Sequence, residues 1–112
     1  MALNKKSSFE STEITLADFA KALSHPARIA IIKTLAEKQT CICGEIVEVM
    51  PLAQATVSQH LKELKNFGLI RGEIDGAKSC YCINWDALNE YTALFHAFLE
   101  SIKKFKQNQS CC

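Results

Sequence analysis

The hydrophobic periodicity of this chain changes after Gly68 and changes back near Asp86, and this double change limits the folds that the chain can adopt. Before Gly68, apolar residues recur at spacings of three and four, as in amphipathic helices. After it, "LIRGEI" and "SCYCIN" alternate around the turn sequence Asp75-Gly76, which predicts a β-hairpin. From Asp86 the helical spacing returns. The pattern therefore predicts helices, one hairpin and a final long helix.

Four helical segments are expected before the hairpin. Ser24 can cap the second of them, Pro26 suits its first turn, and Gly68 suits the C-terminal end of the fourth. Two short helices joined by a tight turn at Pro51, with a hairpin directly after them, indicate a winged helix-turn-helix domain. The predicted fold class is mainly α with a β-hairpin wing, with about five helices and two strands. The four expected segments lie near residues 16–23, 26–35, 44–50 and 54–67.

The final helix carries an apolar seam that needs a facing surface. Its members are spaced three and four residues apart, as in a heptad repeat. In so short a chain, the same helix of a second copy is the expected partner, which predicts a homodimer through the first and last helices. Packing of the seam on its own domain alone is the alternative. The seam consists of Leu88, Tyr91, Phe95, Phe98, Ile102 and Phe105.

Length and composition predict a single globular domain. The chain has 112 residues, of which 48% are apolar and 22% charged. We expect a flexible N-terminal tail at 1–12, the folded domain at 13–106 and a cysteine-bearing tail at 107–112. The formal net charge is +1, so a basic DNA-binding surface has to be local. No signal peptide and no membrane span are recognisable, so we expect a cytoplasmic protein without a membrane partner.

The fourth helical segment has the polar side chains that a DNA-reading helix needs near its N-terminus. Gln pairs with adenine, Ser and Thr bind base edges or phosphates, and Lys and Arg bind phosphates. The expected partner is double-stranded operator DNA, and the alternative is a merely solvated helix face. The candidate DNA-binding residues are Gln54, Thr56, Ser58, Gln59, His60, Lys62, Arg71 and Lys78, with Lys65 as a further phosphate contact.

The segments "ALSHPAR" and "TVSQHLKELKNFGLI" resemble the arsenic-repressor (ArsR/SmtB) family of bacterial winged-helix repressors, and the resemblance runs from about Leu16 to Ile83. It implies a homodimer that blocks a promoter until a metal or metalloid ion releases it. It also implies DNA contacts from Gln54 to His60, with the hairpin as a wing. Ala53 departs from the family, which usually has a capping Ser there. Loss of that cap costs about 1 kcal/mol of helix stability.

Six cysteines in a reducing compartment are better read as ligands or sensors than as a disulfide framework. Cys41 and Cys43 resemble the Cys-x-Cys pair with which some members of the family bind arsenite or antimonite. The pair lies one residue earlier than usual, and Ile46 replaces a third cysteine. The resemblance thus implies trivalent arsenic, As(III), or antimony, Sb(III), as inducer, with no constitutive cofactor.

The geometry of the expected helix start constrains such a site. Residues i and i+2 of a regular helix do not face each other, so Cys41 and Cys43 can hold one atom only if the helix start is distorted. A third thiolate could come from Cys111 or Cys112 in the polar C-terminal tail. Two further cysteines, at positions 80 and 82, share one face of the expected strand and are either small apolar residues or less favoured ligands.

Other readings of the same residues stay open at this point. The thiols could sense oxidants, persulfides or a thiophilic metal such as cadmium in the same repressor fold. A thiol redox enzyme is disfavoured because the chain lacks a thioredoxin-like α/β pattern, and a winged helix used only for protein contact is a third class. The zinc site that some family members build on the last helix is not expected, because Asp86 has no His two residues later and His96 lacks partners.

Overall fold

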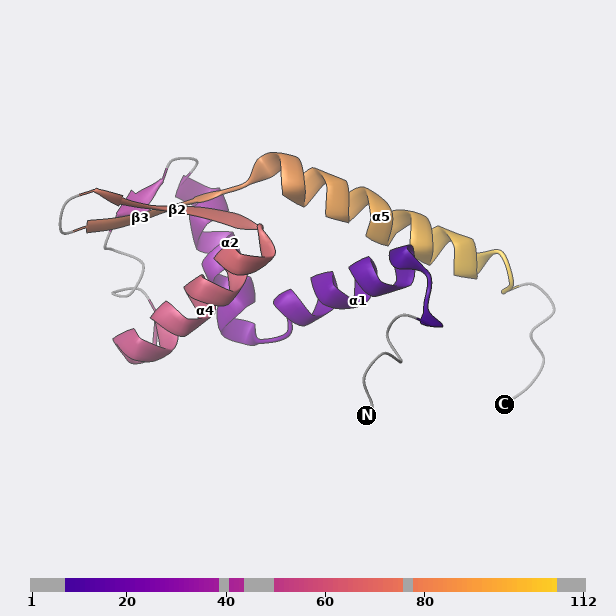
Figure 1. Ribbon diagram of the computed structural model, residues 1–112, viewed down its shortest axis with the longest axis horizontal. Coiled ribbons are helices and arrows are strands. Elements are labelled where there is room, and N and C mark those ends of the chain that lie inside the picture. The colour runs from indigo at the N-terminus through magenta and orange to yellow at the C-terminus, as the bar shows by residue number, and fades with distance from the viewer. Residues whose placement is uncertain (1–7, 39–40, 44–49, 76–77, 107–112) are drawn as a thin grey trace.

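The computed structural model describes residues 8–38, 41–43, 50–75 and 78–106. Four helices and three strands lie within these residues, and they confirm the mainly helical winged fold (Figure 1). Of the helix predicted at 44–50, only Met50 belongs to the described residues, and it lies in a bend. The elements are α1 (Ser11–Ala22), α2 (Pro26–Lys38), β1 (Ile42–Cys43), α4 (Gln54–Phe67), β2 (Ile70–Asp75), β3 (Lys78–Ile83) and α5 (Trp85–Lys103).

The junction between α1 and α2 differs in one detail from the prediction. Ser24 does not cap α2, because its hydroxyl donates a hydrogen bond to the Lys21 carbonyl, 2.7 Å away, at the end of α1. The imidazole of His25 takes that role, since its Nδ1 accepts from the backbone N–H of Ala27 at 2.9 Å. Pro26 is the first residue of α2, where the missing N–H of proline costs nothing.

Both ends of α4 follow from the sequence. Ala53 occupies the N-cap position, and its methyl group makes no capping hydrogen bond, as its replacement of the usual serine predicts. Gly68 ends the helix with φ at 103°, a left-handed conformation that glycine adopts without steric cost. Its N–H bonds to the carbonyl of Leu64. The chain turns there directly into β2, and only Gly68 and Leu69 separate α4 from the hairpin.

The sheet has three antiparallel strands in the order β1-β3-β2. In the hairpin, Ile70 pairs with Ile83 and Asp75 with Lys78, as the alternating pattern predicts. Strand β1 was not predicted: Ile42 pairs with Tyr81 and Cys43 with Cys80. The segment that carries Cys43 is therefore extended where the sequence suggested the start of a helix. A two-residue strand has too short a period to be recognised from sequence, and its pairing partner is distant in the chain.

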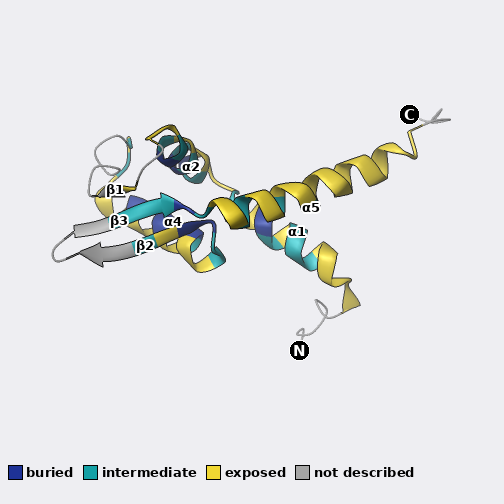
Figure 2. Cartoon of the chain, turned by 90° about the horizontal axis from the view of Figure 1, so that it is seen from above, coloured by how far each residue is buried: buried dark blue, intermediate teal, exposed yellow. Residues whose placement is uncertain are grey.

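The core lies where α1, α2, α4 and the base of the sheet meet (Figure 2). Its buried side chains come from α1, α2 and α4, from Leu69 and from the base of the hairpin at Ile70 and Ile83, which explains why the apolar positions of those segments follow the expected periods. Phe19 of α1 stacks on Tyr91 of α5, with ring centroids 5.3 Å apart, and so joins the first turns of α5 to this core. The largest fully buried residues are Ile31, Leu35, Val57, Leu64, Leu69 and Ile70.

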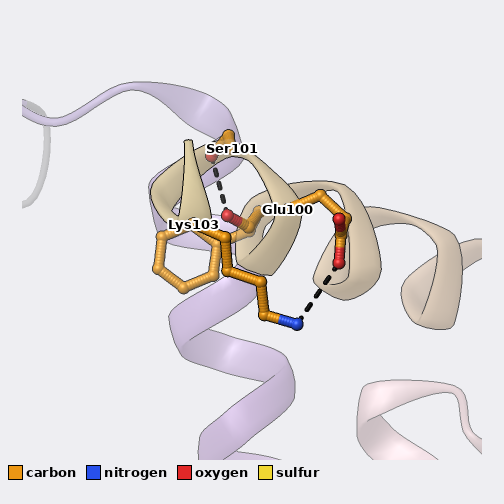
Figure 3. A network of polar contacts seen from close by, with 4 residues as sticks. Glu100, Ser101 and Lys103 are labelled. Carbon is orange, nitrogen blue, oxygen red and sulfur yellow. Dashed lines mark hydrogen bonds and ion pairs between the residues drawn. The ribbon is translucent and has the colours of Figure 1, made fainter. Parts of the chain in front are cut away.

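Helix α5 runs well beyond the core, alongside α1 (Figure 1). None of its 19 residues is buried, and Figure 2 shows it exposed along most of its length. Its last turns make polar contacts with themselves: Glu100 pairs with Lys103 at 3.4 Å, and the Ser101 hydroxyl donates to the Phe98 carbonyl (Figure 3). Among the described residues, no helix is long and apolar enough to cross a membrane.

Candidate DNA-binding face and cysteine site

Helix α4 has two distinct faces. The inner face consists of Val57, Leu61 and Leu64, each at most 3% exposed, and it packs against the core. The outer face is polar and open to solvent, because the polar positions fall on the opposite side of the helical period. The predicted DNA-binding residues on this exposed face are Gln54, Thr56, Ser58, Gln59 and Lys62, and Lys65 is exposed as well.

Within that outer face, Gln59 already has a partner. Its amide nitrogen donates to the Glu63 carboxylate at 3.2 Å. Binding of Gln59 to a base would exchange this contact for one to DNA. Of the predicted wing residues, Arg71 is exposed near the base of β2, and Lys78 is the first residue of β3, although its side chain lies outside the described part. The polar face of α4 and the wing therefore follow each other along the chain.

His60 differs from the prediction that it contacts DNA. Only 8% of it is exposed, and its Nδ1 accepts a hydrogen bond from Nε of Arg28 at 3.1 Å. Its ring lies 4.3 Å from the ring of His25, measured between centroids. The inward position follows from the helical period, which places residue 60 beside Val57 and Leu61 on the apolar face. His60 therefore joins α4 to α2 and is not available to a base edge.

Arg28 is a structural residue that the sequence reasoning missed. Besides the bond to His60, its Nη1 donates to the carbonyls of Lys21 and Ala22, at 3.2 and 3.3 Å. The Lys21 carbonyl also accepts from the hydroxyl and the N–H of Ser24, so the guanidinium adds a further donor at the C-terminal end of α1. Arg28 thus ties the end of α1 to α4. The signal in the sequence was the "SHPAR" motif, in which Ser24 and Pro26 predict the start of a helix, whereas no role is predicted for its arginine.

We expect the stability of the fold to decline as the pH falls below about 6.5. Burial lowers the pKa of His60, the charges of His25 and Arg28 lower it further, and Glu63 opposes them. At a pH below the ordinary histidine pKa, His60 therefore binds a proton in the unfolded chain but stays neutral in the folded protein. This difference in proton binding favours unfolding.

Chemical denaturation at pH 7.5 and 5.5 measures this decline. The variant His60→Asn lacks the titrating group and should lose part of the pH dependence. The control His96→Gln changes an exposed histidine on α5 and should retain it. If the free energy of unfolding fell by the same amount between pH 7.5 and 5.5 in both variants and the wild type, the assignment to His60 would be contradicted.

The cysteines are arranged differently from the prediction. Cys41 forms a disulfide with Cys82 of β3, across a Cα–Cα distance of 4.4 Å and a sequence separation of 41 residues. Cys80 is disulfide-bonded as well, and the register places it opposite Cys43. The wing strand, which the sequence reasoning disfavoured, thus supplies the observed partner of Cys41. The missed signal was the presence of two C-x-C motifs, one on each side of an antiparallel pair.

The extended backbone also removes a geometrical obstacle. Alternate residues of an extended segment share a face, whereas residues i and i+2 of a helix do not. The helix distortion expected for Cys41 and Cys43 is therefore unnecessary. Cys111 and Cys112, the other predicted ligands, lie outside the described residues. In the part of the chain that is described, no group of three or more His, Cys, Asp and Glu side chains forms a metal site.

Comparison with known proteins identifies the family. Residues 25–71 match the model for the bacterial regulatory protein, arsR family. A transcriptional repressor named SmtB, from Mycobacterium tuberculosis, is 42% identical over 57% of this chain, which spans 47% of that protein. An arsenical resistance operon repressor of Bacillus subtilis is 32% identical, with 82% of this chain and 85% of the repressor covered.

Solved structures agree on the fold. The crystal structure of the ArsR family transcriptional regulator RHA00566 superposes with a TM-score of 0.70 over 88% of this chain and 96% of that chain, at 19% identity. Similarity at that level of identity shows the fold alone. The matched family and these relatives are transcriptional regulators and not enzymes. On the relationship to the Bacillus repressor, most of which is covered, this chain belongs to the ArsR family of bacterial regulatory proteins.

Proposed function

We propose that this protein is a transcriptional repressor that binds double-stranded operator DNA through α4 and the wing and leaves it when trivalent arsenic or antimony binds cysteine thiolates. The observation that carries the DNA-binding part is the two-faced α4. Its apolar side is buried in the core, and its side chains at 54, 56, 58 and 59 are polar and exposed near the helix N-terminus. A helix presented in this way can enter the major groove.

The proposal includes a homodimer through α1 and α5. Phe95, Phe98 and Ile102 are 39, 42 and 50% exposed along one side of α5. Phe95 and Phe98 line an apolar groove of about 720 Å³ between α1 and α5, which Leu16 and Leu94 also line. A stripe of large apolar side chains at heptad spacing is suited to the same stripe of a second copy. Two-fold symmetry would then present two α4 helices to the two halves of a pseudo-palindromic operator.

The inducer part of the proposal depends on thiol chemistry. Arsenic and antimony in the trivalent state prefer soft thiolate ligands, and the reduced forms of Cys41 and Cys43 provide two within one extended segment. Cys111 and Cys112 remain the proposed sources of a further thiolate. The Bacillus relative, an arsenical resistance operon repressor, is compatible with this inducer class. Because operator DNA lies in the bacterial cytoplasm, the proposal places the protein there.

A second candidate inducer is favoured by one specific observation. The disulfide between Cys41 and Cys82 is the product that oxidation of two neighbouring thiols gives. The same repressor could therefore respond to oxidants or persulfides, and cadmium, another thiophilic metal, belongs to the same alternative. Mass spectrometry after treatment with arsenite, cadmium, peroxide or persulfide separates these inducers by the mass that each adds or removes.

A gel-shift titration of the reduced protein against the DNA upstream of its own gene tests the proposal. We expect operator binding to weaken as the salt concentration rises. For Lys62→Ala, the slope of the logarithm of the binding constant against the logarithm of the salt concentration should be smaller in magnitude by about one unit. Arsenite should release the wild type but not Cys41→Ser or Cys43→Ser, both of which should still bind the operator. Normal release of both variants would exclude these ligands. If no sequence-specific binding occurs, the chain serves protein contact instead.

A further inference from the structure

The register of the sheet places the four internal cysteines in two rows that cross β1 and β3. Continuing the pairing of Cys43 with Cys80 by two residues places Cys41 opposite Cys82, where the disulfide is found. Directly opposite residues of antiparallel strands lie on the same face of the sheet. Positions 41, 43, 80 and 82 therefore share one face.

That face is not the one that packs against the core. Ile70 and Ile83, which pair with each other in the ladder, are 2% and 7% exposed and belong to the core cluster, and Tyr81 packs partly against it. Side chains alternate along a strand, so Cys82, between Tyr81 and Ile83, points to the opposite face. Cys82 is half-buried and Cys41 is exposed. The reading of Cys82 as a small core residue therefore does not fit, and a reagent in solution can reach the pair.

We propose that Cys41 and Cys82 form a reversible redox pair, and that the state of this pair decides whether the protein can take up a trivalent metalloid. This inference rests on the proposed function as a thiol-responsive repressor and adds the wing strand to its effector site. When the pair is a disulfide, neither sulfur has a thiolate to offer. When it is reduced, Cys82 is positioned as a thiolate ligand next to Cys41, as an alternative source of the further thiolate to Cys111 and Cys112.

The redox step balances with a peroxide as oxidant. The thiolate of Cys82 attacks one oxygen of hydrogen peroxide, which forms a sulfenic acid on Cys82 and releases hydroxide that becomes water. The thiolate of Cys41 then attacks the sulfenic sulfur, forms the disulfide and releases a second hydroxide, which takes up a proton to become the second water. Two thiols lose two electrons and two protons, and one peroxide is reduced to two waters. Reversal requires a cellular dithiol, which is oxidised to its own disulfide by exchange.

The ladder position opposite Cys82 is occupied by a cationic residue, which we expect to favour the first of these steps. Arg71 of β2 pairs with Cys82 in the ladder, so the row across the sheet reads Cys41, Cys82, Arg71. Arg71 is exposed, and its Nη2 lies 3.4 Å from the side-chain oxygen of Asn84. A guanidinium next to a thiol favours the reactive thiolate form. We therefore expect the row of Cys82 to be the one that reacts with peroxide.

Peptide mapping of the full chain under non-reducing conditions tests the pair directly. After treatment of the reduced protein with hydrogen peroxide, we expect a cross-linked peptide that joins Cys41 to Cys82. The variant Cys82→Ser should lack it, and the control Cys111→Ser/Cys112→Ser should keep it. Arg71→Gln should slow its formation several-fold. A dominant bond from Cys41 to Cys43 or to the tail, or none at all, would overturn the pairing.

Arsenite uptake, followed by thiolate absorbance, tests the regulatory part. The reduced wild type should bind arsenite at least tenfold more tightly than the oxidised wild type, and dithiothreitol should restore binding. Reduced Cys82→Ser should bind more weakly than the reduced tail variant. Equal arsenite binding by the oxidised and reduced wild type would overturn the regulation. If the Cys41–Cys82 bond forms as expected but the reduced protein binds no operator, it is the proposed repressor function that fails and not the pairing.

Discussion

The double substitution Phe98→Glu/Ile102→Glu is expected to convert the protein from a dimer to a monomer and to weaken operator binding about 100-fold or more, because a dimer gains a second, linked half-site without new contacts. Both side chains are at least 42% exposed in the single chain, and α5 contributes no buried residue to it. The substitutions should therefore leave the fold of the monomer intact while placing charges in an apolar contact. Light scattering and a gel-shift titration measure the two effects.

The matched control for this experiment is Ala93→Glu. Residue 93 is also exposed on α5, but it lies on the side of the helix opposite to the seam. It adds one negative charge, where the double variant adds two, and should change neither the mass of the assembly nor the operator affinity appreciably. A double variant that remains dimeric, or that binds the operator as tightly as the control, would show that the seam is not the dimer interface.

Ile31→Ala is expected to reduce the free energy of unfolding by about 3 kcal/mol, because it deletes three buried carbon atoms and leaves a cavity. Ile31 is completely buried in α2, within the cluster that includes Val57 and Leu64 of α4. A loss of this size is a large fraction of the stability of a small domain. Because the cavity lies between α2 and α4, operator affinity should fall as well. Urea denaturation measures the free energy of unfolding, and a gel-shift titration measures the operator affinity.

Ile29→Ala provides a control on the same helix with the same chemical change. Ile29 is 44% exposed, so truncation leaves no closed cavity, and the better helix propensity of alanine offsets part of the loss. We expect a change of less than about 1 kcal/mol. If the two variants lost equal stability, the burial of Ile31 would not be what stabilises the contact of α2 with α4.

Local signals account for the parts of the fold that the sequence predicts well. Gly68 ends α4 through a conformation that few other residues adopt, and the alternation around Asp75 predicts both strands of the hairpin. The outer face of α4 follows from the helical period alone. His60 is the exception, because its polar side chain suggests a place on the outer face. The helical period instead places it on the buried face, where its Nδ1 accepts a hydrogen bond from Arg28.

The cysteine arrangement could not be predicted in the same way. Cys41 and Cys82 meet only because β1 pairs with β3, and a pairing between segments about forty residues apart has no local signature in one sequence. A helix start at Cys41 is expected from the sequence, and in a helix the side chains of residues i and i+2 do not share a face, as they do in a strand. Two C-x-C motifs of equal spacing fit the two strands of an antiparallel pair, and this is the signal in the sequence that indicates the arrangement.

Arg28 fixes how motion can be distributed in this molecule. One guanidinium bonds to the last carbonyls of α1 and to the ring of His60 in α4, so neither helix can shift relative to the other without breaking those bonds. Asn84, at the junction of β3 and α5, fixes the other end of α4, because its side-chain amide donates to the Gly68 carbonyl and its backbone N–H donates to the Leu69 carbonyl. Helix α4 is thus bonded both to the end of α1 and to the end of β3, and we expect a displacement of β3 to be transmitted to α4 instead of being absorbed between them.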